Sequence, residues 1–217
     1  MNLCRDLDGR VRLLLLVGLS FIGRAQGAVV YDNTTTSLAQ FYYSQNEYGD
    51  EINLAGADRT MTRFQFDIFA EALNPGAAVD VRFYQNDGSG LPAQPLTLLY
   101  DSGSLSITAA GQSPIVLNNL SVNVPSTITW TVQFSNVDPT HRIGLLFYNP
   151  PTVGSSFNDF WENVPASGWG AFGFGQGLVA NFNAQATAVP EIPALWQSLL
   201  LVGAGLIAPW RFRRSDG

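Results

Sequence analysis

The feature that most constrains the fold of this chain is a two-residue alternation of apolar and polar side chains. Its clearest instance is Ile-Thr-Trp-Thr-Val-Gln-Phe at 128–134, where the large apolar residues line one face. Segments 62–68 and 79–83 show the same alternation. Because successive side chains of a strand point to opposite faces of a sheet, the pattern predicts strands with one buried face. Such strands are typical of antiparallel sheets.

Turn-forming residues separate these runs, as in Asn-Pro-Gly at 74–76 and Asn-Asp-Gly-Ser-Gly at 86–90. No long segment between the two ends has a helical period. Shorter apolar runs predict further strands at 96–100, 115–124, 143–148 and 178–182. The sequence therefore predicts an all-β domain, a two-sheet antiparallel β-sandwich of jelly-roll type.

The first 27 residues have the three-part pattern of a secretory signal peptide. A basic leader precedes an apolar run at 13–23, which is too short to span a bilayer comfortably. Small residues follow at Ala25 and Gly27, and we expect signal peptidase to cut between Gly27 and Ala28. An uncleaved anchor is the alternative. The single cysteine, Cys4, lies in this segment, so the mature chain would contain no disulfide.

The C-terminus combines a short proline motif, an apolar run at 194–210 and the basic residues Arg211, Arg213 and Arg214. At about 1.5 Å per residue, the run meets the lower limit for crossing a membrane. Basic residues beyond it favour a cytoplasmic end. The sequence predicts one transmembrane helix within a tail of residues 187–217; a buried terminal helix of the domain is the alternative.

This tail resembles the PEP-CTERM sorting domain of Gram-negative bacteria, which joins a Pro-Glu-Pro-like motif, one transmembrane helix and an arginine-rich end. Pro190 and Glu191 match the first two motif positions, whereas Ile192 occupies the third and Pro193 follows it. The resemblance implies recognition by an exosortase, a membrane enzyme of the cysteine-transpeptidase type. It also implies delivery to the cell surface or extracellular matrix of a bacterium that produces exopolysaccharide.

The middle of the chain is similar to a domain found in other PEP-CTERM proteins. That resemblance implies an uncharacterised secreted sandwich and carries no catalytic residue. We expect residues 28–186 to fold without the tail, because every predicted strand lies inside them. The similar stretches are 62–69, 81–88, 99–103, 124–132 and 150–162.

Charge excludes one class of partner. Between residues 28 and 190, four arginines stand against thirteen acidic residues, and the chain has no lysine. A polyanion would be repelled by this excess of negative charge, so we expect no binding to nucleic acid.

Candidates for catalysis are few. The mature chain has one histidine, His141, and no cysteine, which excludes the usual zinc sites. The loop at 86–90 has one carboxylate, so we interpret it as a hairpin turn and not as a calcium loop. We expect no metal, no cofactor and no enzymatic activity.

Carboxylate pairs are the remaining catalytic candidates, because glycosidases use two carboxyl groups across a cleft. One group is Glu47 with Asp50 and Glu51, which we interpret as a solvated acidic loop. The other is Asp159 with Glu162. A glycoside hydrolase is therefore the third functional hypothesis.

The aromatic block at 157–162, followed by Trp169, permits two interpretations. Trp161 and Trp169 would stack on sugar rings in a carbohydrate-binding module, since nearby amides and carboxylates can bind the hydroxyls. Alternatively, these aromatics belong to the core, the interpretation that the sequence favours. The leading functional prediction is an exported, exosortase-sorted surface or matrix protein without catalysis, with carbohydrate binding as the alternative.

Overall fold

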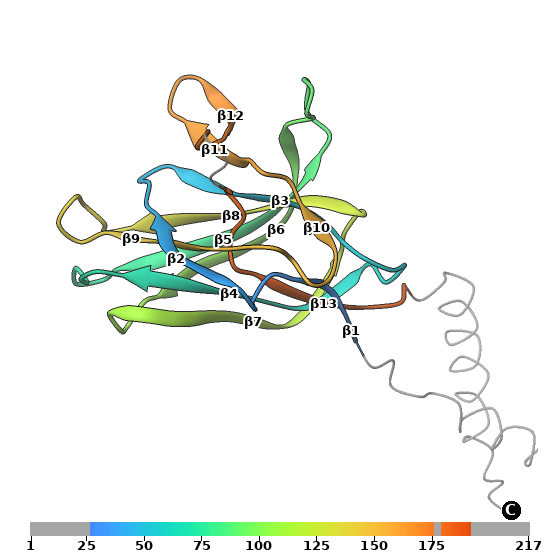
Figure 1. The fold of residues 1–217 in the computed structure, drawn as a ribbon, viewed down its shortest axis with the longest axis horizontal. Coiled ribbons are helices and arrows are strands. Elements are labelled where there is room, and N and C mark those ends of the chain that lie inside the picture. The colour runs from blue at the N-terminus through green and yellow to red at the C-terminus, as the bar shows by residue number, and fades with distance from the viewer. Residues whose placement is uncertain (1–26, 176–178, 192–217) are drawn as a thin grey trace, which may run out of the picture.

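The computed structural model describes residues 27–175 and 179–191, where every regular element is a β-strand (Figure 1). Among these residues, no helix is long and apolar enough to cross a membrane. Several predicted features lie outside the described residues. They are the signal peptide up to residue 26, including Ala25, the motif residues Ile192 and Pro193, the helix at 194–210, and Arg211, Arg213 and Arg214.

The strands form two sheets in which every pair is antiparallel, as predicted. The first sheet has the order β1-β13-β4-β9-β2, with β7 on the other side of β4. Its strands are β1 (Ala28–Asp32), β2 (Ser37–Tyr42), β4 (Thr60–Ala70), β7 (Gly111–Asn123), β9 (Ile143–Tyr148) and β13 (Gln185–Val189).

The second sheet has the order β12-β11-β3-β8-β5-β6, with β10 also paired to β3. Its strands are β3 (Glu47–Asn53), β5 (Ala78–Asn86), β6 (Pro95–Ser106), β8 (Thr127–Ser135), β10 (Ser155–Ser156), β11 (Phe160–Val164) and β12 (Gly168–Phe172).

Aromatic side chains from the two sheets meet in the core. Trp130 of β8 lies with its ring centroid 5.1 Å from that of Phe64 and 5.2 Å from that of Phe66, both on β4. All three residues are at most 1% exposed. Burying each such ring removes apolar surface from water and stabilises the fold by about 2–3 kcal/mol. The fold is thus a β-sandwich whose core comes from the predicted alternating strands.

The segments with the strongest apolar–polar alternation are strands in the structure, but two other predictions were wrong. The run at 178–182 is not a strand in its described part, where Phe182 makes only an isolated bridge to Phe147. The acidic stretch from Glu47 to Glu51, predicted to be a solvated loop, is strand β3 and is buried. Side chains of β5, β8 and β11 contact its glutamates and shield them from solvent.

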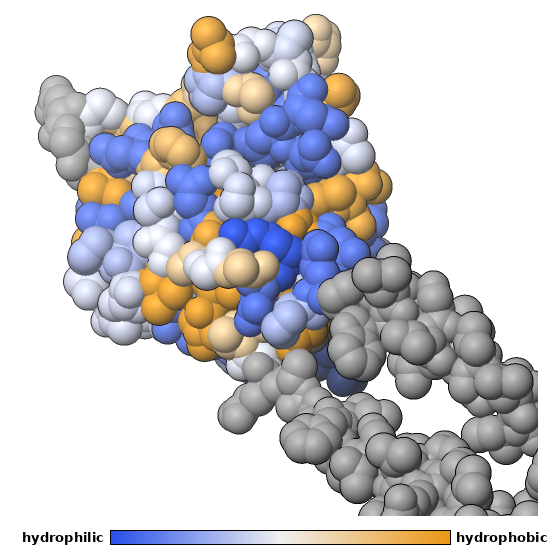
Figure 2. Space-filling model, turned by 90° about the vertical axis from the view of Figure 1, so that its right-hand side faces the viewer, coloured by the Kyte–Doolittle hydropathy of each residue, from blue (hydrophilic) through white to orange (hydrophobic). Residues whose placement is uncertain are grey.

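The domain ends later in the chain than predicted, because its last strand is β13. β13 lies between β1 and β4, with Ala188 opposite Ala28 and Val189 opposite Thr60. The predicted boundary at residue 186 therefore cuts an inner strand, and the folded unit continues to Val189. The pairing also brings the start and the end of the domain to one end of the sandwich, on the right of Figure 1. Viewed from that end, hydrophilic and hydrophobic residues are interspersed on the surface (Figure 2).

Candidate functional site

The outer face of the second sheet is partly enclosed. The β5–β6 connection and the β11–β12 hairpin both extend beyond the sandwich at the top of Figure 1. Gln94, in the β5–β6 connection, donates a hydrogen bond of 3.3 Å to the carbonyl oxygen of Trp169 in β12. The Trp169 ring meets the Tyr84 ring of β5 edge-on, with centroids 5.5 Å apart. These contacts fold β12 back over the sheet.

Glu47 of β3 is the centre of a polar network on this face. Its carboxylate accepts hydrogen bonds from the Tyr84 hydroxyl at 3.0 Å and the Thr131 hydroxyl at 2.6 Å. Arg82 forms an ion pair with Glu47 at 3.2 Å and another with Asp101 at 2.7 Å. Burial, together with the negative charge of Glu47, raises the pKa of Tyr84, so its hydroxyl remains a donor. The network fixes the orientation of the carboxylate and neutralises its charge.

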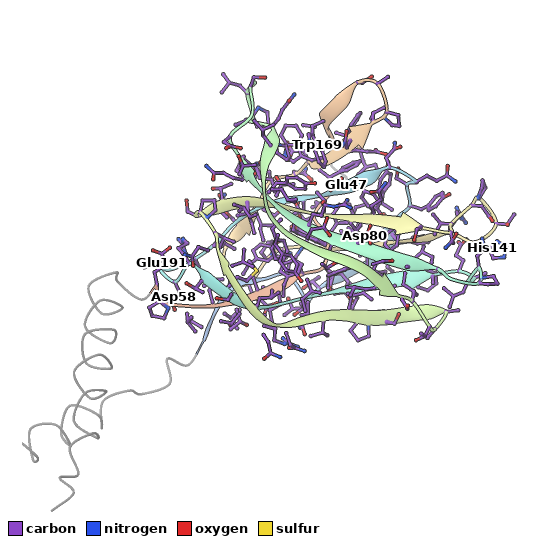
Figure 3. The ribbon with its side chains drawn as sticks, turned by 180° about the vertical axis from the view of Figure 1, so that it is seen from behind. Glu47, Asp58, Asp80, His141, Trp169 and Glu191 are labelled. Carbon is purple, nitrogen blue, oxygen red and sulfur yellow. The ribbon has the colours of Figure 1, made fainter. Side chains whose placement is uncertain are left out.

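A groove of about 310 Å³ lies beside this network. Asn163 of β11 is opposite Glu47 on one side and opposite Trp169 on the other, so the three residues form a row across three strands. Figure 3 shows Trp169 beside the β11–β12 hairpin, with Glu47 near it and Asp80 farther along the sheet. The groove is lined by Gln45, Asn46, Glu47, Gln133, Asn163 and Pro165.

The lining of this groove is polar but almost neutral. Gln45, Asn46, Gln133 and Asn163 contribute four carboxamides, each with both a donor and an acceptor. The lining contains one carboxylate, that of Glu47, and Arg82 is paired with it. Such a surface suits a ligand rich in hydroxyl groups, because a hydroxyl also donates and accepts.

The two predicted sugar-stacking aromatics are placed differently. Trp161 is 2% exposed, and its indole N–H donates to Glu51 at 3.0 Å. Trp161 is thus buried, as the favoured interpretation expects, and the stacking alternative is wrong for it because the ring has no face open to a ligand. Trp169 is partly exposed and stands next to Asn163 of the groove.

The predicted carboxylate groups are separated by the sheet. Glu47 and Glu51 point to the outer face, whereas Asp50, at the alternate position, points into the core and is 0% exposed. Glu162 is also buried, and it accepts from Tyr42 at 2.9 Å and Asn46 at 2.8 Å as well as from Ser44. A glycosidase mechanism needs two carboxylates across a cleft, whereas the lining of this groove contains one, that of Glu47.

The other candidates occupy turns. His141 is partly exposed in the turn before β9, with its Nδ1 3.1 Å from the Asp138 carboxylate. The 86–90 segment belongs to the β5–β6 connection, and Asp87 accepts hydrogen bonds from Thr97 across it. In the described ranges, no group of three or more His, Cys, Asp or Glu residues is placed to bind a metal ion.

The polar network was missed in the sequence because its members come from strands that are far apart in the chain. The available signal was Arg82, a rare positive charge on the polar face of an alternating segment in a strongly acidic chain. Compared with known proteins, the chain matches no protein-family model, no curated protein and no solved structure.

Proposed function

We propose that this chain is an exported surface or matrix protein without catalytic activity, sorted by an exosortase through residues 187–217. The observation that carries the proposal is the position of the two processing sites. Ala28, which follows the expected signal-peptidase cut, pairs with Ala188, two residues before Pro190. The two sites thus bracket one complete sandwich. Pro190 and Glu191 also line a surface hollow of about 490 Å³, which supports the proposal because a processing enzyme must reach its motif.

The proposal places the mature protein in the envelope, at the cell surface or in the extracellular matrix of a Gram-negative-type bacterium. Its partners are then signal peptidase, exosortase and, before processing, the membrane. The test expresses the full chain in matched hosts with and without exosortase. We expect a shorter envelope form only when exosortase is present, and less of it for Pro190→Ala and Glu191→Ala. The same product length in both hosts would contradict the proposal.

We also propose that the sandwich has jelly-roll connectivity. The order β2-β9-β4-β7 in one sheet and β3-β8-β5-β6 in the other supports it. In this arrangement successive long strands alternate between the sheets, except for the β5–β6 hairpin. A crystal structure of residues 28–191 with a different strand order would exclude it.

A second candidate function is the binding of a neutral glycan, such as an exopolysaccharide, on the outer face of the second sheet. The groove next to Trp169 favours it, because four carboxamides and a neutralised carboxylate lie within reach of one partly exposed aromatic ring. Polar groups that orient a ligand beside an apolar face are the usual composition of a sugar site.

The test screens residues 28–191 on a polysaccharide array and then measures affinity for the best ligand. Trp169→Ala should weaken binding about tenfold, which corresponds to ~1.4 kcal/mol. Phe172→Ala is the matched control, because Phe172 is a 42% exposed aromatic of the same strand whose side chain points to the other face. No binding to any polysaccharide, or equal losses for both variants, would exclude this function.

A further inference from the structure

The hydroxyl of Ser156, in the short strand β10, has an unusual set of neighbours. Its Oγ lies 2.8 Å and 3.0 Å from the two carboxylate oxygens of Asp50. It also lies 3.2 Å from the carboxamide oxygen of Asn181. A serine hydroxyl has one proton, so it cannot donate to both side chains at once. The Ser156 oxygen, a nucleophile, therefore lies next to both a base and an amide carbonyl group.

The side chains around the Ser156 hydroxyl are largely shielded from solvent. Asp50 is 0% exposed and Asn181 is 4% exposed, while Ser156 is half-buried. Burial raises the pKa of Asp50 well above its ordinary value, so its ionised form is a stronger base and its protonated form can return the proton. In the described residues, the salt bridges of Arg82, His141 and Arg142 involve other acids, and none reaches Asp50.

The amide is held in place from both sides. The side-chain nitrogen of Asn181 donates to Asn149 at 2.9 Å. The backbone N–H of the next residue, Phe182, donates to Asp50 at 3.1 Å. The base and the amide are thus linked through Asn181 and Phe182, two adjacent residues of one segment.

We propose that Ser156 and Asn181 form an intramolecular ester in the folded protein, with Asp50 transferring the proton. The Asp50 carboxylate takes the hydroxyl proton while Ser156 Oγ attacks Cγ of Asn181, and a C–O bond forms. The C–N bond of the amide then breaks, the proton passes from Asp50 to the nitrogen, and ammonia leaves. The reaction neither oxidises nor reduces any group, and it consumes no second molecule.

The distances permit this attack after a small side-chain movement. Oγ is 3.2 Å from the carboxamide oxygen. With a C=O bond of about 1.2 Å, Oγ is at most about 4.4 Å from the carbonyl carbon. Reacting atoms in a productive arrangement stand about 3–3.5 Å apart. Rotation of the Ser156 and Asn181 side chains can supply the difference.

Such an ester would strengthen the sandwich where it has no other covalent support. Ser156 belongs to a strand paired with β3 of the second sheet. The carbonyl of Asn181 accepts a hydrogen bond from Tyr148 of β9, in the first sheet. The bond would therefore connect the two sheets, as a disulfide does in domains that contain cysteine. Sequence 28–217 contains no cysteine.

The test is peptide mass spectrometry of the full chain after proteolysis. We expect the peptides that contain residues 156 and 181 to appear linked, with a combined mass lower by one ammonia. Hydroxylamine, which cleaves esters, should separate them. A succinimide at Asn181 would also lose ammonia but would not link two peptides. Unlinked peptides of full mass from the folded wild-type protein would overturn the proposal.

Three variants assign the roles. Ser156→Ala and Asp50→Asn should yield unlinked peptides. Apart from the substitution itself, the peptides should have the masses expected without loss of ammonia. Ser155→Ala is the matched control, because Ser155 is the exposed neighbour and its hydroxyl contacts Asn53 at 3.2 Å instead. The linkage should persist in this control. Persistence of the linkage in Ser156→Ala would show that another nucleophile forms it.

Discussion

Removal of the Glu47 carboxylate should reveal how strongly the outer face of the second sheet is held together. In Glu47→Ala, the Thr131 hydroxyl loses its acceptor while Thr131 remains 0% exposed. A buried hydroxyl without a partner costs about 1–3 kcal/mol. Tyr84 and Arg82 are less completely buried, and Arg82 keeps its ion pair with Asp101. We therefore expect a total loss of about 3 kcal/mol, most of it from Thr131.

A double-mutant cycle with Thr131→Val separates this contact from its surroundings. Thr131→Val alone should cost about 1 kcal/mol, since Glu47 keeps two other partners. In the double variant no buried hydroxyl is left without a partner, so the combined loss should be smaller than the sum by about 1–2 kcal/mol. Urea unfolding of residues 28–191 measures all four free energies.

The control is Asp80→Ala, whose side chain is 31% exposed and pairs with the same arginine at 3.4 Å. A pair this open to solvent should contribute about 0–1 kcal/mol. Additive losses for Glu47→Ala and Thr131→Val would refute the reasoning. They would mean that water or another group satisfies Thr131 when Glu47 is removed.

Three further predictions concern stability. The fragment 28–186 should melt at a lower temperature than 28–191, because it lacks the residues of β13 that pair with β1 and β4; equal melting temperatures would contradict the assigned role of β13. Burial raises the pKa of Asp50 above its ordinary 3.8, so the folded state prefers the protonated acid. Stability contributed by this proton is complete below about pH 4 and is lost as the pH rises, and Asp50→Asn should flatten that decline in unfolding free energy measured against pH. Gly49→Ala should cost about 3 kcal/mol or more by urea unfolding, because the new Cβ would overlap the Trp130 carbonyl on the adjacent strand; a near-neutral effect would mean that β3 and β8 can separate freely.

The sequence by itself determined the all-β class and the central strands of both sheets. Segments 62–68, 79–83 and 128–134 bury large apolar side chains at every second position, and no other backbone geometry places such residues on one face. This signal is local, because it needs only the identity of residues two positions apart. Turn-forming residues, also a local signal, sufficed to interpret 86–90 as a hairpin turn.

Only the tertiary structure determined whether the residues without that alternation are buried or exposed. Glu47, Asp50 and Glu51 look like a solvated loop in sequence, yet they form an inner strand because distant residues supply their hydrogen-bond partners. The sequence favours burial of Trp161, but only the structure shows that Glu51 of a distant strand accepts its N–H. A polar side chain can be buried once its partners are present, and those partners are brought together only by the packing of strands far apart in sequence.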